Sequence, residues 1–89
     1  MTVLIDDPIW PAHGRLWAHL VSDHSLEELH DFARRNDLPP RGFDRDHYDV
    51  PEEALPRLIA AGAEHVGGKE LVRRLIASGL RVPARDRRR

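Results

Sequence analysis

Residues 2–8 read Thr-Val-Leu-Ile-Asp-Asp-Pro, a short apolar and β-branched run that ends in two acids and a proline. A run of this kind is typical of a strand that is buried on both faces and closed by a turn. Residues 63–66, ahead of Gly67 and Gly68, are a second candidate for a buried strand, and residues 47–50 are expected to form a brief extended segment. The sequence therefore predicts two buried strands with a short one between them.

Three amphipathic segments, 26–36, 51–62 and 69–78, are expected to form helices. The Ser25 hydroxyl can accept from the backbone of Glu28, and the Glu28 side chain can reach back, as in a capping box. A proline opens the second segment, and glycines end the second and the third. The inward-facing stripes are Leu26, Leu29 and Ala33, then Leu55, Leu58 and Ile59, then Leu71, Val72, Leu75 and Ile76.

The stretch 8–24 has mixed signals. Four of its apolar residues have helical spacing, whereas Gly14 weakens a helix at its start. We expect a loop followed by one or two helical turns. The four apolar residues are Leu16, Trp17, Leu20 and Val21.

Strands and helices alternate in this order, which favours an α/β sheet with parallel pairing. We expect one small single α/β domain over residues 1–82, with a short, mostly parallel sheet of two or three strands and about three packed helices. Residues 83–89 lack an apolar anchor and are expected to form a disordered, Arg-rich tail.

The composition excludes several classes of protein. The 89 residues contain no cysteine, so neither a disulfide framework nor a thiolate zinc site nor a thiol nucleophile is possible. No apolar run approaches the ~20 residues that cross a bilayer, and the N-terminus lacks the basic region of a signal peptide. We expect a cytoplasmic protein without membrane contact.

The net charge of −1 hides an asymmetry. Residues 1–80 carry nine basic and fourteen acidic side chains, whereas residues 81–89 carry five arginines and one aspartate. An Arg run can bind nucleic acid by neutralising phosphates, but it can equally be a frayed, solubilising end. The net negative charge of residues 1–80 argues against a broad nucleic-acid-binding face.

Histidine and aspartate are concentrated in the first half of the chain. Five of the six histidines lie between residues 13 and 47, and eight aspartates lie between residues 6 and 49. Neutral imidazole and carboxylate suit divalent transition metals such as zinc, manganese, iron or nickel. They also suit general acid–base chemistry near neutral pH.

Each candidate residue has a plainer explanation beside the functional one. Asp6 follows the first strand, where ligands gather in parallel sheets, but it can also cap a turn. His30 follows Glu27 by three positions, a spacing found in carboxylate-bridged metal sites, yet it borders an apolar stripe. His47 and Asp49 share one side of an extended segment, although Asp49 can instead cap the following helix.

His19 and Asp23 are four residues apart and would share one face of a helix. Gly67, Gly68 and Lys69 could offer amides to an anion, but the P-loop pattern is missing. The motifs Gly-x-Ser-x-Gly, Gly-x-Gly-x-x-Gly and His-Glu-x-x-His are all absent.

Several segments together resemble the domain of unknown function 4031 family (DUF4031), which comprises small bacterial and phage proteins. They are Val-Leu-Ile-Asp-Asp at 3–7, Trp-Ala-His-Leu-Val-Ser-Asp at 17–23, Ser-Leu-Glu-Glu-Leu-His-Asp-Phe-Ala at 25–33, His-Tyr-Asp-Val at 47–50, Gly-Ala at 62–63 and Glu-Leu-Val at 70–72. The resemblance covers residues 2–80 and brings no established activity. It implies that Asp6, His19, Asp23, His30, His47 and Asp49 belong to one pattern.

Two readings of the function stay open. In the first, a metal-assisted hydrolase acts on a small phosphoester or nucleotide-derived substrate: His30, His47 and Asp49 (or Asp6) hold one divalent ion, and His19 or a remaining aspartate, Asp6 or Asp23, acts as base. In the second, the chain is a non-catalytic binding or assembly module. Trp10 and Trp17 would then anchor an interface, such as that of a homo-oligomer. The sequence does not decide between an enzyme and a binding module.

Overall fold

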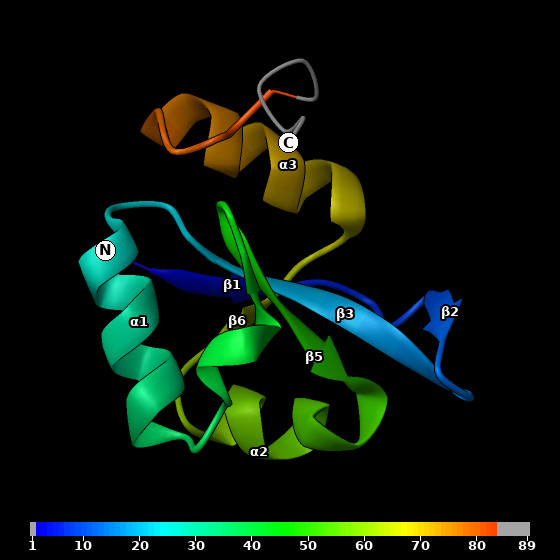
Figure 1. Cartoon of the computed structure of the whole chain (residues 1–89). Helices are drawn as coiled ribbons and strands as arrows, with labels where there is room; N and C mark the ends of the chain where they lie inside the picture. The colour runs from blue at the N-terminus through cyan, green and yellow to red at the C-terminus, as the bar shows by residue number, and fades with distance from the viewer. Residues whose placement is uncertain (1, 84–89) are drawn as a thin grey trace.

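The computed structural model describes residues 2–83, which form a sheet with helices on both faces (Figure 1). The elements, in chain order, are β1 (Val3–Ile5), β2 (Trp10–Ala12), β3 (Arg15–Ser22), α1 (Leu26–Arg35), the 3-10 turn η1 (Pro40–Gly42), β4 (Phe43–Asp44), β5 (His47–Pro51), the 3-10 turn η2 (Glu52–Ala54), α2 (Leu55–Ala60), β6 (Glu64–His65) and α3 (Gly68–Ser78).

The expectation of a short, mostly parallel sheet of two or three strands is wrong. The sheet has six strands in the order β4-β5-β3-β1-β6, with β2 also paired to β3. The pairs β1–β3, β2–β3, β3–β5 and β4–β5 are antiparallel, and only β1–β6 is parallel among the described strands. The molecule is still a small α/β domain with three α-helices, but its sheet is mixed and mostly antiparallel.

The error lies in residues 8–24, which form a β-hairpin in place of a loop and helical turns. β2 and β3 are joined by His13 and Gly14, whose φ angles of 51° and 78° are those of a two-residue turn with both positions left-handed. Leu20 and Val21 are both fully buried, on opposite faces of β3. Burial on both faces removes the apolar–polar alternation that marks a strand, and the remaining apolar spacing imitates a helix.

The predicted start of α1 is confirmed in part. The Ser25 hydroxyl accepts a hydrogen bond from the Glu28 N–H at 3.0 Å, as a cap should. The Glu28 side chain does not reach back to Ser25, because its carboxylate accepts from the hydroxyl of Ser22 at the end of β3. The helix start is therefore tied to the sheet. The left-handed residue after the helix is Asp37, at φ 60°.

The later elements follow the prediction with shifted limits. The second helical segment divides into η2 and a six-residue α2. α3 begins at Gly68 and ends at Ser78, and the φ of 85° at the following Gly79 is the left-handed stop expected of a glycine there. β6 is a two-residue edge strand with both residues exposed, and so is not the buried strand predicted for residues 63–66.

Two apolar clusters lie on opposite faces of the sheet. α1 and α2 cover the larger one, which contains Ala18, Leu20 and Val50 from the strands. α3 lies on the other face (Figure 1), where Leu71 and Leu75 pack on Leu4 and Val21. Since this second cluster is small, α3 covers only part of its face, and polar side chains occupy the remainder.

No helix within residues 2–83 combines the length and apolarity needed to cross a membrane. The tail predicted to be disordered, residues 83–89, lies outside the described residues except for Pro83.

Replacing Leu75 tests how far the second cluster stabilises the domain. Leu75 is 1% exposed and anchors α3 to the sheet, so Leu75→Ala should lower the free energy of unfolding by about 2–4 kcal/mol. The neighbouring Ile76 is 59% exposed, and Ile76→Ala should change it by less than about 0.5 kcal/mol. Urea unfolding of both variants measures the difference, and equal losses would contradict the packing described above.

Candidate metal centre

The antiparallel pairing of β3 with β5 brings the candidate residues together. His19 lies directly opposite Asp49 in the register of the two strands. Because side chains alternate along a strand, His19 shares a face with Val21, which packs under α3. His47 and Asp49, two residues apart on β5, lie on that face as well. This is the part of the sheet beside α3 that the helix leaves uncovered.

His19, His47 and Asp49 form a compact set of potential metal ligands. One ligand atom from each residue lies within 4.8 Å of the others. The two imidazole rings meet edge to face, with centroids 5.1 Å apart. Cross-strand neighbours thus supply two nitrogens and one oxygen to a common point.

The Nδ1 atom of each histidine contacts a buried carboxylate. His19 Nδ1 lies 2.9 Å from Asp6 Oδ2, and His47 Nδ1 lies 2.7 Å from Asp46 Oδ1. A carboxylate only accepts, so both rings carry their proton on Nδ1 and keep Nε2 available. Carboxylate–histidine pairs of this kind orient the imidazole ligands of metal sites and raise their basicity.

Asp6 is fixed by more than the ring of His19. Its other oxygen accepts from the His19 backbone N–H at 2.6 Å. Asp6, which follows β1, therefore binds both the backbone and the side chain of a residue in β3. The N-terminus of α3 also lies near: a Cβ on Gly68 would be 3.8 Å from Asp6 Oδ2. The positive end of that helix favours the carboxylate. Asp6 is 6% exposed and Asp46 is fully buried.

Asp49 is the unsatisfied member of the set. Its Oδ1 is buried and accepts no hydrogen bond from any residue in the described range 2–83. It lies 3.1 Å from His47 Nε2, close enough to pair with a protonated imidazole. Two ligands of a tetrahedral zinc ion are about 3.3 Å apart, given metal–ligand distances of ~2.0–2.1 Å. The spacing and aim of these two atoms suit a shared cation.

The electrostatics around His47 also favour a cation. Burial would lower the pKa of His47, but the adjacent carboxylates of Asp49 and Asp46 outweigh it and hold the pKa above its ordinary value. A proton on Nε2 and a metal ion would occupy the same position between the ring and Asp49.

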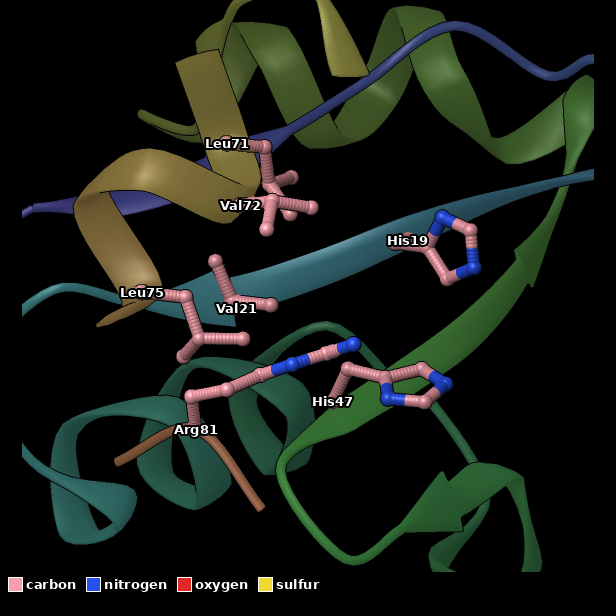
Figure 2. A pocket seen from close by; sticks show the side chains of 7 residues that line it. All are labelled: His19, Val21, His47, Leu71, Val72, Leu75 and Arg81. Atoms are coloured by element: carbon pink, nitrogen blue, oxygen red, sulfur yellow. The ribbon is translucent and has the colours of Figure 1, made fainter. Parts of the chain in front are cut away.

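A cavity of about 330 Å³ opens on the histidine side of this set (Figure 2). Four apolar side chains from β3 and α3 form one wall, and the Arg81 side chain extends over the cavity. Asp46 holds the segment that follows α3: its Oδ2 accepts from the Val82 N–H at 2.8 Å and lies 3.7 Å from Arg81 Nη1. The apolar wall consists of Val21, Leu71, Val72 and Leu75.

The structure groups His19, and not His30, with His47 and Asp49. His30 lies on α1, on the other face of the sheet, where its Nδ1 is 2.7 Å from the hydroxyl of Tyr48 and its ring packs on Phe43. The resemblance had implied a single pattern that included His30. Helical spacing identifies neighbours on a helix, but it cannot tell which face of a sheet the helix will cover.

Asp23 also lies apart from the set, at the far end of β3. Its two oxygens accept from the Thr2 N–H at 2.8 Å and from Arg74 at 2.7 Å. Burial would raise the pKa of Asp23, but the Arg74 hydrogen bond and the Thr2 N–H outweigh it, and the pKa lies below the ordinary value. These contacts give Asp23 the role of joining the N-terminus to α3.

Three residues of the site were not singled out from the sequence. Asp46 carried no prediction of a site role, Trp10 was considered only as an interface anchor, and Arg81 entered only the charge count of residues 81–89. Asp46 directly precedes His47 in the tight β4–β5 turn, where Arg45 has a φ of 59°. An acid next to a candidate histidine was the one local signal available.

A family model described as "Protein of unknown function (DUF4031)" matches residues 3–78. The chain belongs to this family. No significant match is found among curated proteins or among solved structures. In this DUF4031 domain the matched segment includes Asp6, His19, Asp46, His47 and Asp49, whereas Arg81 lies beyond it.

The Asp23–Arg74 pair of this DUF4031 domain gives a pH-dependent contribution to stability. A folded-state pKa below the unfolded value, near 3.8, means that the contribution is present above that value and is lost as the pH falls through the lower folded pKa. Asp23→Asn should therefore be less stable than the native chain at neutral pH, with a deficit that shrinks between about pH 5 and pH 2.

Urea unfolding across that pH range measures the deficit. Asp31→Asn is the matched control, because Asp31 pairs with Arg34 and Arg35 on the exposed surface of α1. A deficit that stays constant with pH would contradict the assignment.

Proposed function

We propose that the domain holds one divalent transition metal ion between His19, His47 and Asp49 and uses it to hydrolyse a small phosphoester. The observation that carries the proposal is the pairing of both Nδ1 atoms with buried carboxylates, beside a buried Asp49 oxygen that accepts no hydrogen bond within residues 2–83 and lies 3.1 Å from His47 Nε2. An unsatisfied buried carboxylate oxygen is costly, and a bound cation removes that cost.

The donor set points to a class of metal. Two imidazoles and one carboxylate suit zinc, iron, manganese or nickel better than magnesium or calcium, which prefer oxygen alone. Three protein ligands leave at least one coordination position for water, as in catalytic zinc sites. Such an ion lowers the pKa of its bound water toward neutrality.

The protein residues around the ion have separable roles. Asp6 and Asp46 are positioning residues, since each contacts a histidine and not the reacting centre. Arg81, on the same cavity as both histidines, offers a guanidinium to the non-bridging oxygens of a phosphoester. An ion held by His19, His47 and Asp49 would supply an activated water for attack at phosphorus, with the ester P–O bond breaking and the departing alkoxide taking a proton from bulk water.

Metal binding is the first test. Untagged protein, stripped with a chelator and titrated with Co²⁺ or Zn²⁺, should bind one ion per chain. Asp46→Asn should weaken binding by roughly 10–100-fold, the usual effect of losing an outer partner. His47→Ala should weaken it further, whereas His24→Ala, an exposed residue outside the set, should leave it unchanged. Failure of the native chain to bind any of these ions would sink the proposal.

Hydrolysis is the second test. With the metal-loaded chain and p-nitrophenyl phosphate or its diester, Arg81→Gln should raise KM more than it lowers kcat, because Arg81 contacts the anion and not the water. Arg73→Gln removes the same charge from the exposed side of α3 and should behave as the native chain. Absence of turnover with every metal that binds would reject hydrolysis while leaving the metal site intact.

A further inference from the structure

A second cavity, of about 530 Å³, lies against Asp49 and extends along the β2–β3 hairpin. The hairpin supplies Trp10 and Trp17, and residues 37–39, 41 and 42 also line the cavity. We call this cavity the tryptophan groove. Asp49 lines it, while His19 and His47 line the cavity of Figure 2, so the candidate metal centre lies between the two.

The two tryptophans of the groove are the only ones in the chain. They are cross-strand partners with ring centroids 6.5 Å apart, and Trp10 in turn stacks on His19, at 5.7 Å and 24°. One aromatic surface therefore leads from the groove to the metal ligands. Aromatic faces of this kind stack on nucleobases, whatever the base.

An unpartnered donor gives an independent sign of a ligand. Trp17 Nε1 donates to the carbonyl of Ala12 at 2.8 Å, but the buried Nε1 of Trp10 has no acceptor among residues 2–83. A buried N–H without an acceptor is unfavourable, and the indole N–H of a buried tryptophan usually finds a partner.

The groove also carries a guanidinium that the fold does not use. Arg15 pairs with Glu53 at 2.6 Å and Arg57 donates to the carbonyl of Asn36. Arg41 is exposed, lines the groove, and makes no hydrogen bond or ion pair with any part of the described chain. The groove holds acids as well, namely Asp37 and Asp49, the second of which is assigned to the metal.

We infer that the tryptophan groove binds a nucleotide. The base stacks along Trp10 and Trp17, and the phosphate is neutralised by Arg41. The inference rests on the proposed function only for the fate of the ligand, which would be hydrolysed at the metal; binding itself requires no metal. The inference narrows the substrate class of the proposed hydrolase from small phosphoesters in general to nucleotides.

Binding is measured on chelator-treated, full-length protein with adenosine 5′-monophosphate as the probe. Both tryptophans line the groove, so all tryptophan fluorescence reports on it, and calorimetry supplies an independent affinity. The probe should bind saturably and more tightly than adenosine or inorganic phosphate, each of which offers only half of the contacts. The inference would be overturned if the monophosphate bound no more tightly than the stronger binder of adenosine and inorganic phosphate.

Variants separate the two halves of the site. Arg41→Gln should weaken the monophosphate by about tenfold and leave adenosine unchanged, an outcome that misfolding would not produce. Trp17→Leu should weaken both by roughly 5–150-fold, the effect of losing one stacking partner. Arg73→Gln is the charge-matched control. An Arg41→Gln chain that binds like this control would overturn the inference.

Two further results distinguish this inference from the proposed function. Nucleotide binding by a chain that binds no metal supports the groove and rejects the hydrolase. Metal binding and turnover of p-nitrophenyl phosphate, without nucleotide binding, supports the hydrolase and rejects the nucleotide site in the groove. If phenyl phosphate binds as tightly as the nucleotide, the groove recognises any aromatic phosphate and its assignment to nucleotides is wrong.

Discussion

The register of β3 against β5 is the constraint on which the site depends. His19 faces Asp49 only in this pairing, and a slip of one residue would turn every side chain of β3 to the other face. The register is held from both sides, because Leu20 belongs to the core under α1 and α2 while Val21 packs under α3. A slip would expose one of these fully buried residues to the polar cluster and bury His19 in the apolar core. The same packing that stabilises the sheet therefore fixes the ligand set.

Asp6 and Asp46 fix the orientation of the two imidazoles that this register brings together. A histidine on a strand could rotate about its side-chain bonds, but a carboxylate at each Nδ1 removes that freedom and selects the tautomer. Both acids also perform structural work: Asp6 accepts from the backbone of β3, and Asp46 accepts from Val82 beyond α3. The orientation of each imidazole is thus coupled to the packing of α3 and of the segment that follows it. Loss of either acid would loosen ligand geometry and fold together.

The sequence predicts the helices of this domain much better than its sheet. Helix signals are local: the Ser25 cap and the Gly79 stop lie within one turn of the residues they serve. Strand order and direction depend on contacts between distant residues, such as Ile5 with His65, and burial of both faces of β3 hid its alternation. The candidate site likewise has one part that local spacing predicts and another that only the fold reveals. The two-residue period placed His47 with Asp49, whereas only folding shows that His19 joins them, that His30 faces away, and that Asp46 supports His47.

Asp49 Oδ1 and Trp10 Nε1 are buried polar atoms without a hydrogen-bond partner among residues 2–83, and they lie on either side of His19. Most buried polar groups in folded proteins are satisfied, and each exception costs about 1–3 kcal/mol. A domain of this size has only a few kcal/mol of net stability, so two exceptions are a large fraction of it. Packing does not require them, because an apolar pair at these positions would fill the same part of the sheet without desolvating a carboxylate or an indole N–H. One of the two atoms is an acceptor that suits a cation and the other is a donor that suits an anionic or carbonyl oxygen. On the proposals above, a cation would fill the opening at Asp49 and an oxygen of a bound ligand would fill the one at Trp10.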